Sequence, residues 1–190
     1  MPSSPQKPAF KSYALLTGLV WAGTIIVVLA LNCLVDPLWY FQGNRLTHKN
    51  FAFNERQAKL NQLLRAPGQY DCLIFGSSRT TLLSASAFSG YRCFNLSFSG
   101  GQIEDFIAYA EYLEHLGMRP KLIIVGVDGF NFLRSGRDAP TIPEYVLKKL
   151  PPPGFLKTYL SIDSLRMTWR TIRGSSKMPR YYDDHFEVLI

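Results

Sequence analysis

The sequence predicts an α/β domain that follows a single membrane-spanning helix. Three observations support this prediction. An uncharged apolar run occupies residues 13–35. After residue 50, short apolar runs typical of buried strands alternate with longer amphipathic stretches typical of helices. Each strand-like run ends at a glycine, where the chain can turn sharply or approach another group closely. A chain of 190 residues with a hydrophobic fraction of 47% is typical of folded rather than disordered proteins.

Residues 13–35 include no charged side chain, and Asn32 is the only strongly polar one. As a helix this run is about 35 Å long, which is enough to cross a hydrocarbon core of about 30 Å. Asp36-Pro37 ends it, and three aromatic residues follow where interfacial aromatic belts lie. A cleaved signal peptide and a buried helix of a soluble protein are the alternatives. The run is longer than a signal core, and no small-residue cleavage pattern follows it.

The chain is therefore expected to have five parts. They are a cytoplasmic N-terminus (1–12), the transmembrane helix (13–35), a linker (36–50), an α/β core (51–135), and a loop with a basic helical C-terminal segment (136–190). Lys and Arg near the two ends of the span favour an inside N-terminus only weakly, because basic residues follow the span as well.

Within the core, the apolar runs 71–76, 91–98 and 121–128 indicate strands, and the first and third are expected to be buried on both faces. Residues 51–66 and 102–117 indicate helices, and 81–88 a short helix or turn. The second helix has an apolar stripe made of Ile103, Phe106, Ile107, Ala110, Leu113 and Leu116. Alternating strands and helices predict a parallel sheet with right-handed crossovers.

The basic character of the chain is local. The net charge is +7, and residues 134–180 hold ten Lys or Arg and only three acidic residues. Residues 155–174 have helical spacing in Leu156, Leu160, Leu165 and Trp169, with a basic far side. Anionic lipid headgroups are the nearest partner for such a segment in an anchored chain. A solvated basic face is an equal alternative, and we do not expect nucleic acid to be the partner.

The three cysteines do not form a metal-binding pattern. Cys33 lies in the predicted span, and Cys72 and Cys93 lie in two predicted strands, where each is expected to act as a small core residue. If those strands are neighbours, an oxidising compartment would allow a disulfide between them.

Functional residues of an open parallel sheet collect at the carboxyl ends of its strands. Three such ends, at 76–79, 97–101 and 126–129, each carry glycine. Ser78 at the first end is placed to attack an acyl carbonyl. Backbone N–H groups at Ser78 and at a glycine of the second end would hold the oxyanion, with a polar side chain from the third. Alternatively, Ser78 only caps a helix, and Arg79 either binds an anionic group or pairs with an acid.

These ends resemble the sequence blocks of the SGNH, or GDSL-type, hydrolases. "FGSSR" is similar to the first block, with Ser78 at the nucleophile position. "NLSFSGG" is similar to the second, with Gly100 at the oxyanion glycine. In "IIVGVDGFNF", Asp128 stands where the family often has an oxyanion asparagine. An ionised aspartate cannot donate a hydrogen bond, and Asn131 is a possible substitute.

The order of motifs over roughly residues 13–135 also resembles a membrane-anchored bacterial subgroup of that family. The resemblance implies a three-layer, flavodoxin-like, SGNH-type domain outside the cytoplasmic (inner) membrane. It implies an acyl esterase or O-acetyltransferase that acts on cell-envelope glycan and needs no metal or organic cofactor. The implied partners are the lipid bilayer and either an envelope polysaccharide or an acyl-donor protein.

The family's general base is a histidine in an Asp-x-x-His motif after about five strands, and only three strands are indicated here. His48 lies near the membrane and His115 late in a helix, so His185 is the only plausible partner, although Tyr182 stands at the expected aspartate. Two interpretations therefore stay open: an SGNH-like enzyme of which this chain is the N-terminal, truncated part, or a non-catalytic anchored module that binds a glycan or a protein. A phosphate cradle at Gly76–Arg79 ranks last, because no further glycine or lysine supports it.

Overall fold

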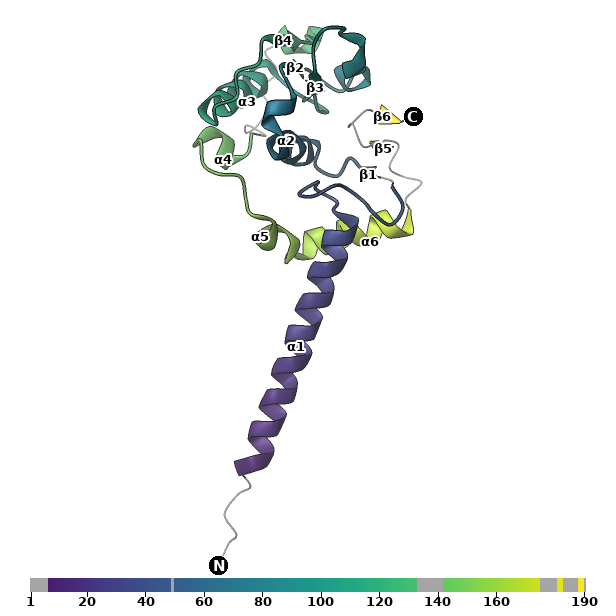
Figure 1. Ribbon diagram of the computed structural model, residues 1–190, viewed down its shortest axis with the longest axis vertical. Helices are drawn as coiled ribbons and strands as arrows, with labels where there is room; N and C mark the ends of the chain where they lie inside the picture. Colours follow the sequence, from purple (N-terminus) through teal and green to yellow (C-terminus); the bar gives the residue numbers. More distant parts are fainter. Residues whose placement is uncertain (1–6, 49, 133–141, 175–180, 183–187, 190) are drawn as a thin grey trace, which may run out of the picture.

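A computed structural model describes residues 7–48, 50–132, 142–174, 181–182 and 188–189. One long helix, α1 (Lys7–Val35), projects from a folded domain (Figure 1). Its segment Lys11–Val35 is long and apolar enough to cross a membrane, and the most apolar window of that segment is not buried against the protein. The predicted N-terminal apolar helix is therefore confirmed as a helix of suitable length.

The centre of the domain is a three-stranded parallel sheet in the order β3-β2-β4. Its strands are β2 (Cys72–Phe75), β3 (Cys93–Asn95) and β4 (Leu122–Val125). Cys72 pairs with Cys93 on one side and with Leu122 on the other. The three predicted strands and their parallel arrangement are confirmed, so the described chain is a mixed α/β protein.

Two helices cover one face of this sheet, α2 (Glu55–Arg65) and α3 (Ile103–His115). The side chain of Asn54 caps α2, and a capping box of Gln102 and Asp105 begins α3. The other face is covered by two 3-10 turns, η2 (Thr80–Leu82) and η3 (Ala85–Ala87). A further 3-10 turn, η1 (Pro67–Gln69), connects α2 to β2. The main core lies between the sheet and the two helices and contains Leu60, Leu63, Leu73, Phe75, Phe94, Leu96, Phe98, Phe106, Tyr109, Tyr112, Leu113, Met118 and Val146.

The buried face of α3 differs from the predicted stripe. Ile107 and Leu116 are exposed, whereas Tyr109 and Tyr112 are fully buried. The Tyr112 ring packs edge-on against Tyr145 of α4 (Glu144–Leu147), with 5.9 Å between the ring centroids. Tyrosine rings bury a large apolar area. Helix α4, which follows β4 in the chain, provides the surface against which the Tyr112 ring packs. Apolar spacing within α3 alone did not anticipate that partner.

Strand β4 is not buried on both faces as predicted. Ile123 and Val125 are 47% and 46% exposed, whereas Leu122 and Ile124 are half-buried. The reason is position, since β4 is an edge strand of the described sheet. It leads into η4 (Gly129–Phe132).

The helical segment predicted at 155–174 is two helices, α5 (Phe155–Tyr159) and α6 (Ile162–Arg173). Ser161 separates them, because its hydroxyl accepts a hydrogen bond from the N–H of Ser164 at 3.1 Å and begins a new helix. A small antiparallel sheet joins β1 (Asn50–Phe51), β5 (Tyr181–Tyr182) and β6 (Val188–Leu189). Strands of two residues have no detectable periodicity, so this sheet was not predicted.

Candidate functional site

The carboxyl ends of the three strands meet around Gly76. The Phe98 N–H donates to the Gly76 carbonyl at 3.1 Å, and the Gly126 N–H donates to the Phe75 carbonyl at 2.8 Å. The segment that connects β2 to β3 covers one face of the sheet. The segment that connects β3 to β4 contains α3 and covers the other face. In open α/β sheets this change of face, here between β2 and β4, marks the usual position of a binding crevice.

Glycines are required at these ends by close approach. A Cβ at Gly76 or at Gly126 would lie 2.2 or 2.1 Å from Oγ1 of Thr80, whose side chain covers both residues. A Cβ at Gly101 would lie 2.8 Å from the Gly76 carbonyl oxygen. A larger residue at Gly76 or Gly126 would therefore displace the Thr80 side chain, and one at Gly101 would push its loop away from Gly76.

Asp128 connects the third strand end to the first. Ser77, which is fully buried, donates its hydroxyl hydrogen to Oδ2 of Asp128. Arg79 pairs with the other carboxylate oxygen, with 3.3 Å between Nη1 and Oδ1. The Arg79 side chain is 85% exposed, so this ion pair contributes little stability by itself. The expectation that Arg79 pairs with a nearby acid is confirmed.

The sequence pattern pointed to Ser78 as the functional serine and not to its neighbour Ser77. The signal that could have found it is strand register, since Phe75 pairs with Val125 and equal steps along parallel strands place 77–78 beside 127–128. Ser78 is half-buried in the turn after β2, and its carbonyl accepts a 2.6 Å hydrogen bond from the Thr81 hydroxyl. Its own hydroxyl makes no hydrogen bond to another described residue.

Gly100 and Asn131 lie in the loops beside this turn. Gly100 has a φ of 68°, a left-handed conformation that favours glycine. The Asn131 side chain accepts a hydrogen bond from the Asp128 N–H at 2.8 Å. It donates to the Gly101 carbonyl at 3.3 Å and to Oε1 of Gln102 at 3.2 Å. Asn131 therefore joins the end of β4 to the start of α3.

A buried lysine that the sequence did not point to supports the second strand end. Lys59 of α2 is fully buried, and its ammonium group donates to the Ser97 carbonyl at 2.7 Å. Asn95 donates to the carbonyls of Thr80 and Leu83 at 2.9 and 2.8 Å. The asparagine of "NLSFSGG" thus holds the turn that follows Ser78. Lys59 brings positive charge close to the loop of Gly100 and Gly101, the glycine loop.

The described histidines lie away from Ser78. His115 is exposed at the last residue of α3, which begins beside the strand ends and runs back to the other edge of the sheet. His48 lines a polar cavity of about 350 Å³ together with Arg45 and Arg65, near the end of α1. His185 lies outside the described residues. Within the described ranges, no three His, Cys, Asp or Glu side chains are grouped so that they could hold a metal ion.

A second cavity of about 440 Å³ is also not at the strand ends. It lies between α3 and the edge strand β4, where Ile107, Met118 and Ile123 are among its lining residues. Met118 and Pro120 belong to the chain that enters β4, so this groove opens toward the amino ends of the strands. It is therefore separate from the turn that carries Ser78.

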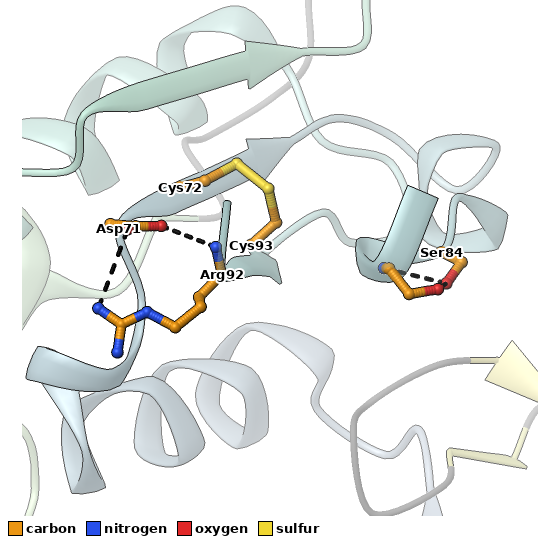
Figure 2. The surroundings of a disulfide bond; sticks show 6 residues. Asp71, Cys72, Ser84, Arg92 and Cys93 are labelled. Atoms are coloured by element: carbon orange, nitrogen blue, oxygen red, sulfur yellow. Dashed lines mark hydrogen bonds and ion pairs between the residues drawn. A yellow bond between two sulfur atoms is a disulfide. The ribbon is translucent and has the colours of Figure 1, made fainter. Parts of the chain in front are cut away.

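Cys72 and Cys93 form a disulfide between the neighbouring strands β2 and β3 (Figure 2). The two residues are register partners, so their strands are neighbours, as a disulfide between them requires. Asp71 adjoins it and accepts a 2.7 Å hydrogen bond from the Arg92 N–H. This hydrogen bond, together with the nearby charges of Arg92 and Lys121, holds the pKa of the Asp71 carboxyl below its ordinary value.

The strand ends together present two serines that are not fully buried, Ser78 and Ser99, a glycine in a left-handed conformation at Gly100, and a carboxylate already engaged by two donors. Such a set offers a nucleophile and a backbone-lined surface for a developing oxyanion. Comparison with protein-family models, with curated proteins and with solved structures finds no match to this chain. Its function therefore has to be inferred from the chemistry of the site.

Proposed function

We propose that the chain is a membrane-anchored, SGNH-like acyl esterase or O-acetyltransferase that acts on cell-envelope glycan through Ser78. The observation that carries the proposal is the position of Ser78. Ser78 is half-buried in the turn directly after the central strand, where the turns after β2 and β4 and the glycine loop adjoin. A nucleophile at that position can reach a substrate lying over the carboxyl edge of the sheet.

The neighbouring residues take distinct roles in this proposal. Gly100 offers its loop to the developing oxyanion. Asp128 accepts hydrogen bonds from Ser77 and Arg79, so it holds the turn in place and is not an oxyanion donor. Asn131 supports the same surface from β4 through its hydrogen bonds to Gly101 and Gln102. The general base comes from residues outside the described ranges, with His185 as the candidate on this chain.

The proposed location is the bacterial cytoplasmic membrane, with α1 crossing it and the domain on the extracytoplasmic side. The length and composition of α1 support the crossing. The Cys72–Cys93 disulfide supports the side, because disulfides persist in oxidising compartments and are rare in the cytosol. Acyl transfer through serine uses side chains and backbone N–H groups, so the proposal includes no metal or organic cofactor.

The test is labelling of the full chain with a fluorophosphonate probe, which reacts with activated serines. We expect labelling of the folded wild type and its loss in Ser78→Ala. Ser77→Ala is the matched control, because Ser77 is the adjoining residue but its hydroxyl is buried and bonded to Asp128. Labelling that survives in Ser78→Ala, with unchanged near-UV circular dichroism, would show that Ser78 is not the nucleophile.

A second candidate is a non-catalytic anchored module that binds a glycan or a protein. It is favoured by one observation, that His48 and His115 lie away from Ser78. This candidate predicts that well-folded wild type takes up no probe. It also predicts that Arg79→Ala weakens ligand binding, since Arg79 is the exposed cation at the strand ends. Probe labelling of the wild type distinguishes the two candidates, because both can bind envelope glycan and only the enzyme reacts with the probe.

A further inference from the structure

Helices α5 and α6 carry an apolar surface that the rest of the described chain does not cover. This surface, the apolar platform, consists of Leu156, Leu160, Ile162, Leu165, Trp169 and Ile172. Ile162 is 70% exposed and Trp169 is 62% exposed. Large contiguous apolar surfaces of this kind mark contacts with membranes or other proteins.

The platform occupies one side of an amphipathic helix. On α6 its residues recur at intervals of three and four, so they form a single stripe. Ser164, Thr168 and Thr171 form the buried side of the same helix. The basic residues of α6 lie on its remaining side and are Arg166, Arg170 and Arg173.

Hydrogen bonds fix α6 at the level of the last turns of α1. The Thr168 hydroxyl donates to Oδ1 of Asn32 at 2.6 Å, and Nδ2 of Asn32 donates to the Tyr159 carbonyl at 2.6 Å. Asn32 is fully buried and lies within one turn of the end of α1. Figure 1 shows α5 and α6 lying across α1 at the point where α1 meets the domain.

The length of α1 places this level at a membrane boundary. The 25 residues of Lys11–Val35 extend about 37 Å as a helix, whereas a hydrocarbon core is about 30 Å thick. The last turns of α1, with Asn32, therefore emerge at the interface. Tryptophan and basic side chains are favoured at that depth.

Two further contacts set the direction in which the platform faces. The Arg170 guanidinium lies 5.6 Å from the centre of the Phe53 ring, so the edge of the basic side that holds Arg170 faces the domain, and Arg166 and Arg173 lie on the edge next to the apolar stripe. Thr168 faces α1. The apolar stripe lies on neither side, which leaves it directed at the surroundings of α1. Lys157, Arg166 and Arg173 are exposed beside it and complement anionic headgroups.

We infer that α5 and α6 form an interfacial element whose apolar platform inserts into the same bilayer that α1 crosses. The exposed basic side chains contact the phosphates of anionic lipids. The bilayer is the partner that covers the apolar platform. The element holds the domain in one orientation on the membrane surface, in place of free rotation on a tether. The inference rests on the proposed membrane crossing of α1.

The experiment measures the depth of nitroxide labels in the full chain reconstituted in phosphatidylcholine vesicles with added phosphatidylglycerol. Labels are attached to single cysteines in a Cys33→Ala background, where Cys72 and Cys93 remain joined. The test positions are Ile162→Cys and Trp169→Cys. Asp163→Cys is the matched control on the same helix, because its side chain is exposed and off the stripe. Leu19→Cys reports the depth of α1.

We expect oxygen to relax the labels at 162 and 169 several-fold more effectively than a neutral, water-soluble nickel chelate. The label at 163 should show the opposite preference. Omitting phosphatidylglycerol should reduce the preference at 169, because the basic side chains lose their partner. Water-like labels at 162 and 169 with a membrane-buried label at 19 would overturn the inference alone. A water-like label at 19 as well would overturn the membrane crossing on which it rests.

Discussion

Tyr109 and Tyr112 are successive buried tyrosines of α3, and they differ in one hydrogen bond. The Tyr112 hydroxyl donates to the Leu150 carbonyl at 2.9 Å. The Tyr109 hydroxyl is buried without a hydrogen-bond partner among the described residues, and burial raises the pKa of its phenol. A buried hydroxyl without a partner carries the cost of its lost hydration.

We therefore predict opposite effects of one chemical change at these two positions. Tyr109→Phe should raise the free energy of unfolding by about 1 kcal/mol, because it removes an unpaired polar group. Tyr112→Phe should lower it by about 1 kcal/mol, because it leaves the Leu150 carbonyl without its donor. Denaturant unfolding of the full chain in detergent, followed by near-UV circular dichroism, measures both. Equal destabilisation by the two variants would contradict the assignment.

At the same scale, the strand-end glycines show which of two predicted roles applies. The sequence permits either a sharp turn or a close approach at a glycine. Gly76 and Gly126 do not have a positive φ, and each lies under the side chain of Thr80. These two glycines therefore allow the close approach of the Thr80 side chain, and Thr80 is not a sequence neighbour of either glycine.

At the scale of elements, the carboxylate of Asp36 fixes the conformation of the chain where α1 ends. Asp36 accepts hydrogen bonds from the N–H groups of Tyr40, Phe41 and Gly43 at 2.8, 2.9 and 2.7 Å. It also accepts one from the Tyr159 hydroxyl of α5. The aspartate of the Asp-Pro exit thus folds the following residues back and connects α1 to α5.

Asn32 makes the second connection between α1 and the C-terminal helices, and it supplies a prediction. Asn32→Leu should leave the Thr168 hydroxyl and the Tyr159 carbonyl buried without partners, at a cost of about 2 kcal/mol. The amides of α6 should then exchange with solvent roughly 30-fold faster, because detachment of α6 becomes easier by that amount.

The matched control is Thr24→Val on the exposed part of α1. The Thr24 hydroxyl bonds only within the helix, to the Val20 carbonyl at 2.9 Å, so this variant should leave exchange in α6 unchanged. Hydrogen exchange followed by mass spectrometry of the 162–173 segment measures both variants. Unchanged exchange in Asn32→Leu would mean that other contacts hold α6 on α1.

At the scale of the whole molecule, the Cys72–Cys93 disulfide constrains the unfolded chain. The two cysteines are 21 residues apart, so the bond closes a loop whose entropy is removed from the unfolded state. Reduction, or the double variant Cys72→Ser with Cys93→Ser, should lower the free energy of unfolding by about 3 kcal/mol. Cys33→Ser should have no such effect, since Cys33 is a free cysteine. Denaturant midpoints with and without reductant check this prediction, and equal midpoints would contradict it.

The parts of the fold that could be predicted are those with a local pattern. The positions of α1, α2, α3 and the three strands followed from apolar runs and periodicity. The approach of the three strand ends followed from parallel topology, as the contacts around Gly76 confirm. The break at Ser161 and the sheet containing β1 were not predicted, because each depends on a few residues without a period.

The sequence by itself determined a long apolar helix, a parallel α/β core and a set of glycine-bearing strand ends, since each of these is encoded in neighbouring residues. Tertiary structure decided that Ser77 bonds to Asp128, that α3 buries its tyrosines, and that one side of β4 is exposed. It also decided that the stripe of α6 faces outward beside α1. These outcomes depend on which distant segment lies opposite each side chain, and packing between segments far apart in the chain is not encoded in any single local pattern.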